Sequence, residues 1–193
     1  MKKFELTNEF ITNMFGTKLF RIRALVEFGD VEAGELGGYV EKESNLGHDD
    51  NAWVYDNAWV YGDAQVSGDA LVYDNARVYG NARVYDNAWV YGNAQVSGNA
   101  RVYGDARVCG NGDYAYAHGF GSVNRTTTFF RLKDGGVGVR CGCFYGTLAQ
   151  FRDKIRETHG ETKKAQEYLM LADLMELRFE EDENEVGNRK YVE

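Results

Sequence analysis

Proline is absent from this 193-residue chain, and cysteine is scarce, with only three residues. An odd number of cysteines does not build a disulfide framework and is typical of a reducing compartment. No long apolar run occurs, and the N-terminus is charged and mixed. The sequence therefore predicts neither a membrane span nor a signal peptide, and it favours a cytoplasmic location.

Positive charge and histidine are also in short supply. The net charge of −8 argues against non-specific binding to nucleic acid. Of the three histidines, His118 is the only candidate catalytic base, and a weak one. His159 ends a predicted helix, where its charge complements the helix dipole, and His48 is predicted at a solvated corner. Cys141 and Cys143 lack a partner pair for zinc and are expected as buried strand residues, so we predict no metal site and no cofactor.

The dominant feature that is present is a repeat. Residues 52–111 form ten consecutive six-residue units without insertion, such as AWVYDN and ARVYGN. Ala is first and Val third in every unit, an alternation that indicates a strand with one buried face. The fifth and sixth residues, Gly or Asp and then Asn or Asp, favour a corner. One unit cannot bury its own inner face, so the units must coil and stack, and the 23 glycines of the proline-free chain serve the corners.

These units resemble the hexapeptide-repeat, left-handed parallel β-helix family, which implies three hexads per 18-residue coil. We expect a mainly β fold with a small α+β region at its C-terminal end. Its predicted parts are an N-terminal strand region or cap (1–39), the β-helix (40–123), a β-hairpin with two helices (124–179) and a disordered acidic tail (180–193). Val40–Asn45 and Leu46–Asn51 are predicted to form the opening coil in the phase of the later hexads, and the helices are predicted at Leu148–His159 and Lys163–Phe179.

Grouping the outward residues that lie 18 positions apart in the sequence separates three faces of the predicted coil. The first face is the most apolar and is predicted as an oligomer interface through Trp53, Tyr55, Leu71, Tyr73, Trp89 and Tyr91. A homotrimer is the assembly that the resemblance implies. The alternative is that the chain's own C-terminal helices cover this face.

The hairpin is the predicted ligand site. Asp134-Gly135-Gly136 is typical of a tight turn between Thr126–Lys133 and Val137–Phe144. Arg131 and Arg140 are expected to face the same way, where they repel unless an anion lies between them. Arginine forks beside bare backbone and aromatic rings suit a phosphate or nucleotide. The predicted ligand-binding residues are Arg125, Phe129, Arg131, Lys133, Gly138, Arg140, Gly142 and Phe144; the alternative is that acidic side chains of the helices neutralise these arginines.

The layout of GELGGYV, the AxVYGN hexads and TTTFFRLKDGGVGVRCGCFYGT followed by two helices resembles hexapeptide-repeat proteins of phages and prophages. That resemblance implies a bacterial host cell. We expect a non-catalytic binding protein, acting in counter-defence by sequestering a nucleotide-type host signal or by blocking a host protein. The alternatives are an acyltransferase with a coenzyme A donor and His118 as base, which the lack of a long loop excursion disfavours, and a structural phage component.

Overall fold

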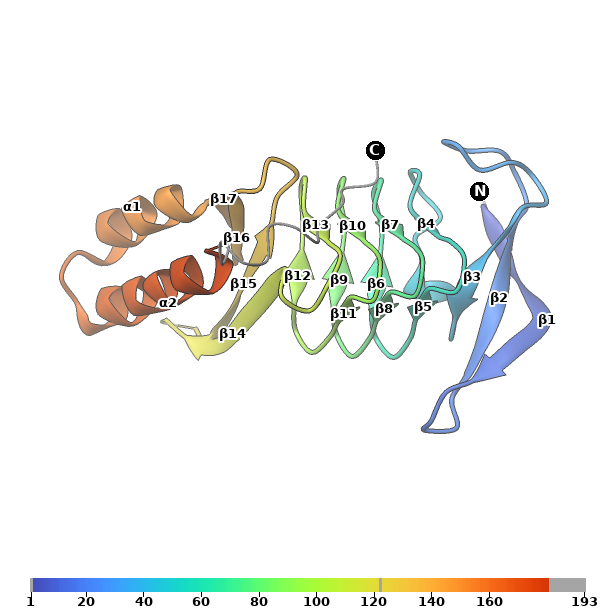
Figure 1. Cartoon of the computed structure of the whole chain (residues 1–193), viewed down its shortest axis with the longest axis horizontal. Coiled ribbons are helices and arrows are strands. Elements are labelled where there is room, and N and C mark those ends of the chain that lie inside the picture. The colour runs from blue at the N-terminus through green and yellow to red at the C-terminus, as the bar shows by residue number, and fades with distance from the viewer. Residues whose placement is uncertain (1, 122, 181–193) are drawn as a thin grey trace.

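The computed structural model describes residues 2–121 and 123–180. These residues form an elongated β-solenoid with antiparallel strands at one end and a sheet with two helices at the other (Figure 1). The fold class predicted from the hexads, a mainly β coil followed by a small α+β region, is confirmed. The predicted acidic tail lies outside the described residues, apart from Glu180.

The solenoid consists of short strands, one in each hexad. Strands 18 residues apart pair in parallel, as Trp53 does with Leu71 and Trp89 with Arg107, so each coil contains three hexads. The three outward faces follow the predicted sorting by 18, in the order β4-β7-β10-β13, β5-β8-β11 and β6-β9-β12. The strands are β4 (Trp53–Val54), β5 (Trp59–Val60), β6 (Gln65–Val66), β7 (Leu71–Val72), β8 (Arg77–Val78), β9 (Arg83–Val84), β10 (Trp89–Val90), β11 (Gln95–Val96), β12 (Arg101–Val102) and β13 (Arg107–Val108).

The repeated residues take the positions that their chemistry favours. The Ala and Val side chains of the hexads are buried along the interior of the solenoid. The fifth position of most hexads has a positive φ, and it is occupied by Gly or by Asp56, Asp74 and Asp86. Glycine adopts this backbone freely and aspartate tolerates it, so each strand is followed by a corner.

The N-terminal strands close one end of the solenoid. β1 (Phe4–Thr12), β2 (Lys18–Ala24) and β3 (Leu36–Val40) are antiparallel, and β3 continues as a parallel neighbour of β5. Phe4 and Ile22 are fully buried and belong to the core cluster of the solenoid. The N-terminal strands therefore pack against the first coil.

The opening coil departs from the predicted phase by two residues. Val40 pairs with Val60 and Leu46 with Val66, so this coil spans 20 residues instead of 18. The two extra residues lie after η1 (Glu43–Asn45), between Leu46 and Val54, which are eight residues apart, whereas their partners Val66 and Val72 are six apart. The buried Asn45 side chain donates to the carbonyls of Gly62 and Ala64, at 3.0 and 2.8 Å. A buried polar side chain thus satisfies backbone carbonyls of the next coil.

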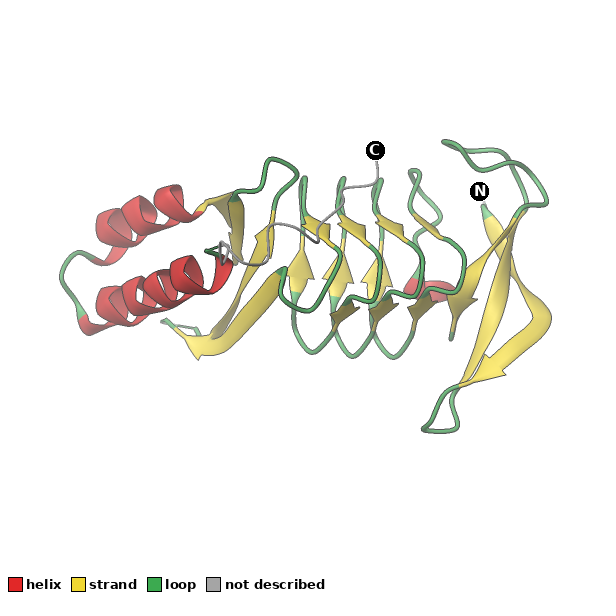
Figure 2. Ribbon diagram, viewed as in Figure 1, coloured by secondary structure: helices red, strands yellow, loops and turns green. Residues whose placement is uncertain are grey.

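The C-terminal region contains four antiparallel strands instead of a single hairpin, followed by α1 (Leu148–His159) and α2 (Lys163–Phe179). The strands are β14 (Tyr114–Phe120), β15 (Arg125–Arg131), β16 (Val137–Cys141) and β17 (Phe144–Thr147). One face of this sheet closes the solenoid through Phe130, and the other packs against both helices through Phe129 and Val139 (Figure 2). The solenoid therefore ends before β14, earlier than the predicted boundary at residue 123.

The helices do not cover the first face of the solenoid, contrary to the alternative considered above. They pack on the side of the sheet that faces away from the coils. The first residue of that face, Trp53, is nevertheless fully buried, because Phe4 and Phe28 of the N-terminal region pack against its ring. Trp53 is thus excluded from an oligomer interface. Leu71, Tyr73 and Tyr91 are half-buried and Trp89 is exposed, and a trimer through this remaining surface stays a prediction.

Candidate functional site

The register of the predicted hairpin separates the two arginines that were expected together. Arg140 pairs with Thr128, and Arg131 pairs with Val137. Successive side chains along a strand point to opposite faces, so Arg140 faces the solenoid and Arg131 faces the helices. The expected Arg131–Arg140 juxtaposition is wrong because the backbone pair that closes the turn is Leu132 with Gly136.

Arg131 has a structural role. Its Nη1 donates to the carbonyl of Gly135 and its Nη2 to that of Phe179, both at 2.9 Å. Phe179 is the last residue of α2, where a cation complements the negative end of the helix dipole. Arg131, Phe129 and Gly138 are all buried, so their predicted roles as ligand contacts are wrong.

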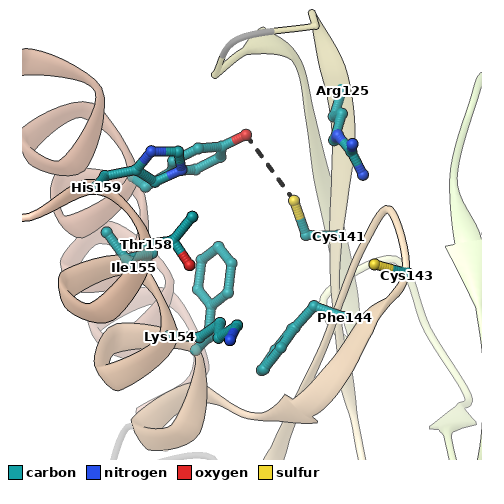
Figure 3. Close-up of a pocket in the computed structure, with 10 residues that line it drawn as sticks. Arg125, Cys141, Cys143, Phe144, Lys154, Ile155, Thr158 and His159 are labelled. Carbon is teal, nitrogen blue, oxygen red and sulfur yellow. Dashed lines mark hydrogen bonds between the residues drawn. The ribbon is translucent and has the colours of Figure 1, made fainter.

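The sheet and α1 enclose a cavity of about 250 Å³, which we call the cap pocket (Figure 3). Two of the predicted ligand residues, Arg125 and Phe144, line it, whereas Lys133 lies in a separate hollow with Asp105 and Tyr145. The residues lining the cap pocket are Arg125, Cys141, Cys143, Phe144, Phe151, Lys154, Ile155, Thr158, His159 and Tyr168.

Aromatic rings form the inner wall of the cap pocket. Phe151 lies 5.5 Å from Phe144 and 5.8 Å from Tyr168, measured between ring centroids. The ring of His159 stacks on Tyr168 at 5.9 Å with an interplanar angle of 22°. Rings at these spacings contact one another directly, so they form a continuous apolar wall.

Gly142 allows Arg125 to reach the pocket. A Cβ atom on Gly142 would overlap the Arg125 guanidinium, and the φ of Gly142 is +60°. Both features require glycine at this turn between β16 and β17. Gly142, predicted as a ligand-binding residue, therefore leaves the space in which the Arg125 guanidinium lies at the rim of the pocket.

A thiol and a phenol meet at the base of the pocket. The Thr127 hydroxyl donates to Cys141 Sγ at 3.2 Å, and Tyr168 Oη lies 3.9 Å from the same sulfur. Tyr168 Oη also donates to the carbonyl of Phe120 at 3.2 Å. Burial, followed by the neighbouring Cys141, raises the pKa of Tyr168 to about 12, so this phenol stays neutral. Cys141 is half-buried and Cys143 is exposed, so the expectation of two buried cysteines is wrong.

The charge at the rim is of one sign. Arg125, Lys154 and His159 are among the lining residues, and the lining contains neither Asp nor Glu. Lys154 forms an ion pair with Glu157, whose Oε2 lies 2.8 Å from Lys154 Nζ. Arg125 forms no ion pair within the described parts of the chain. A positive rim above an apolar wall suits a ligand with a flat ring and an anionic group.

The other histidines lie outside the lining of the cap pocket. His118 is exposed on β14, and its Nδ1 lies 2.8 Å from the Thr126 hydroxyl. A general base is commonly oriented by a carboxylate, and none contacts His118 among residues 2–121 and 123–180. His48 is not a solvated corner as expected, since its ring stacks on Phe4 at 4.5 Å and its Nδ1 accepts from the Lys3 amide.

Sequence reasoning missed most of the α1 side of the pocket. Lys154, Thr158 and His159 lie on α1 beside its buried residues Phe151 and Ile155. The spacing of Lys154 and Thr158, four residues apart, places them on one side of the helix. That spacing was a usable signal, but it did not reveal that this side faces the sheet.

The comparisons with known proteins bear on the solenoid. Residues 64–78, 76–92 and 94–111 match the family model described as YdcK beta solenoid repeat. A comparison with curated proteins gave no match. In the parts of the chain that the structure describes, no helix is long and apolar enough to cross a membrane, and no group of His, Cys, Asp and Glu is arranged to hold a metal.

Proposed function

We propose that this protein is a non-catalytic binding protein whose ligand is a small nucleotide-type molecule held in the cap pocket. The observation that carries the proposal is the composition of the cavity: an aromatic wall, cationic side chains at the rim and no carboxylate in the lining. In this arrangement the nucleobase stacks against Phe144 and Phe151, and the phosphate contacts Arg125.

The size of the cavity narrows the ligand class. About 250 Å³ lies at the small end of ligand cavities, so the pocket holds one ring system and leaves the phosphate at the rim. We therefore expect mononucleotides to bind in preference to larger dinucleotides. Sequestration of a nucleotide-type host signal, in counter-defence, is the use of such a site that the likeness to phage proteins suggests.

Titration calorimetry with a panel of mononucleotides, cyclic nucleotides and acetyl-coenzyme A tests the proposal. Arg125→Gln is expected to weaken the best mononucleotide about tenfold or more, because a charge-assisted hydrogen bond contributes roughly 1.5–3 kcal/mol. Lys164→Gln, at an exposed position of α2 outside the pocket lining, is the matched control and should leave binding unchanged. Equal affinity of Arg125→Gln and the unmodified protein would refute the site, and turnover of acetyl-coenzyme A lost in His118→Ala would support the acyltransferase instead.

A further inference from the structure

The arginines of the solenoid have different neighbours on its three faces. On the first face the Arg107 guanidinium lies 4.0 Å from the centre of the Trp89 ring, and on the second face Arg77 lies 4.2 Å from that of Trp59. On the third face Arg83 and Arg101 are direct partners on neighbouring strands, so one arginine lies next to another. Like charges placed opposite each other on a sheet destabilise it.

A third arginine joins this pair from the C-terminal sheet. Arg140 and the third-face residues Arg83 and Arg101 line one groove of about 300 Å³, together with Gln65, Ser67 and Tyr85. We call it the arginine groove. In the described residues, no Asp or Glu lies within ion-pair distance of these three arginines. Within those residues, the three guanidinium groups that line the groove thus have no carboxylate partner.

Arg140 is held in place before any ligand arrives. Its Nε donates to Tyr85 Oη at 3.1 Å, and its Nη1 donates to the carbonyls of Cys143 and Phe144 at 3.2 and 3.3 Å. Its guanidinium also lies 4.9 Å from the centre of the Tyr103 ring. These contacts fix the fork and lower the entropy that a ligand must overcome.

We infer that the arginine groove is a second anion site, separate from the cap pocket, and that its ligand carries two or three linked phosphoryl groups. Arg83 and Arg101 are one coil apart, about 4.8 Å, and Arg140 lies beside them, so the donors form a short row. Each guanidinium carries five N–H donors, which together exceed what one phosphoryl group accepts. Linked phosphoryl groups match a row of forks.

The surroundings of the groove favour a compact oligophosphate over nucleic acid. Asp49, Asp50 and Asp86 line the adjoining hollow, which shares Ser67 and Tyr85 with the arginine groove. These carboxylates repel a polyanion that extends past the three arginines, and the net charge of −8 adds to that repulsion. The acidic boundary therefore sets the length of the anion.

Titration calorimetry with inorganic tripolyphosphate, pyrophosphate and monophosphate tests this inference. We expect tripolyphosphate to bind at least tenfold more tightly than monophosphate, and Arg83→Gln and Arg101→Gln each to weaken tripolyphosphate about tenfold or more. Arg77→Gln is the matched control, since it removes the same charge from the same hexad position on another face, and it should leave tripolyphosphate binding unchanged. Binding lost equally in Arg77→Gln, or no binding of tripolyphosphate, would overturn the assignment.

Two further measurements keep the result specific. Without ligand, Arg83→Gln should raise the melting temperature slightly because it relieves the Arg83–Arg101 repulsion; with tripolyphosphate it should melt below the unmodified protein. A single-stranded oligonucleotide that displaces tripolyphosphate at equal phosphate concentration would overturn the choice of a compact anion. The effect of Arg83→Gln on tripolyphosphate is compared with the effect of Arg125→Gln on the best mononucleotide, so failure of the cap pocket and failure of the arginine groove can be told apart.

Discussion

The solenoid and the C-terminal region bury their apolar residues through different kinds of contact. In the solenoid, one set of contacts recurs every 18 residues: Ala and Val face inward, and Gly or Asp forms the corner. In the C-terminal region each contact occurs once, and the cap pocket unites β15, the β16–β17 turn, α1 and α2. Repetition produces a uniform support, whereas a site needs side chains that differ from their neighbours. Where the two regions meet, Arg140 of β16 breaks the uniformity of the third face.

The largest expected effect distinguishes the closed end of the solenoid from its open face. Trp53→Ala should lower the free energy of unfolding by about 3–5 kcal/mol, because Trp53 is fully buried against Phe4 and Phe28. Trp89→Ala, at an equivalent hexad position two coils later, loses an exposed stacking contact with Arg107 and should cost about 0.5–1 kcal/mol. Denaturant unfolding of both variants measures the difference. Equal losses would mean that the N-terminal strands do not cap the solenoid as described.

The next effect compares the two interiors. Ala76→Leu should cost about 1–3 kcal/mol or more, because the coils on either side leave no room for added methylene groups. Ala172→Leu on α2 should cost less, since α2 packs on one side only and exposes Met170 and Leu174 on the other. Thermal unfolding compares the pair. A larger loss for Ala172→Leu would show that the C-terminal region is the more rigid of the two.

An outward variant calibrates this comparison. Arg77→Ala removes the guanidinium stacked on Trp59 and should cost about 0.5–1 kcal/mol. A loss as large as that of Ala76→Leu would reverse the assignment of inward and outward positions.

An effect smaller than that of Ala76→Leu tests whether the β16–β17 turn serves the pocket. Gly142→Ala forces alanine into a positive φ, which costs about 1–2 kcal/mol, and displaces Arg125. It should therefore lower both the melting temperature and mononucleotide affinity. Gly135→Ala is the matched control, because Gly135 also has a positive φ and nothing lies near its missing Cβ. If both variants lose affinity equally, the role assigned to Gly142 is wrong.

The smallest effect concerns pH. Burial lowers the pKa of Lys3 from 10.5 to about 8, although Asp50 acts in the opposite direction. Between pH 8 and 10 the unfolded chain binds this proton and the folded chain does not, so stability should rise with pH. Above pH 10 it should fall, because burial raises the pKa of Tyr73 and Tyr168 to about 12 and the folded state keeps protons that the unfolded state loses.

Denaturant unfolding at several pH values measures this profile. Lys3→Met should abolish the rise between pH 8 and 10. A rise of the same size in Lys3→Met would assign it to another group.

The sequence determines the solenoid far more tightly than it determines the site. The hexads predict the coil length and all three faces because the same inward pair, Ala and Val, recurs in every unit. The opening coil could not be phased in the same way, since two extra residues between Leu46 and Val54 interrupt the period of six. In the hairpin, a shift of one residue in the closing pair moved Arg131 from the predicted ligand face to the end of α2.

The two pockets depend on contacts between distant parts of the chain. Arg125 and Phe144 were predicted as ligand residues from local chemistry, but their partners Lys154, His159 and Tyr168 come from the helices. Arg140 was predicted as a ligand residue of the hairpin, yet its neighbours Arg83 and Arg101 belong to the solenoid. Neither set can be assembled until the sheet is placed between the coils and the helices.

Thiol footprinting tests the central claim most directly, because the chain carries its own reporters. Cys143 is exposed and lines the cap pocket, whereas Cys109 lies at the last coil and outside the lining. The proposal predicts that the best-binding mononucleotide slows alkylation of Cys143, measured by mass spectrometry, and leaves that of Cys109 unchanged. Unchanged alkylation of Cys143 at a saturating concentration of that mononucleotide would contradict binding in the cap pocket.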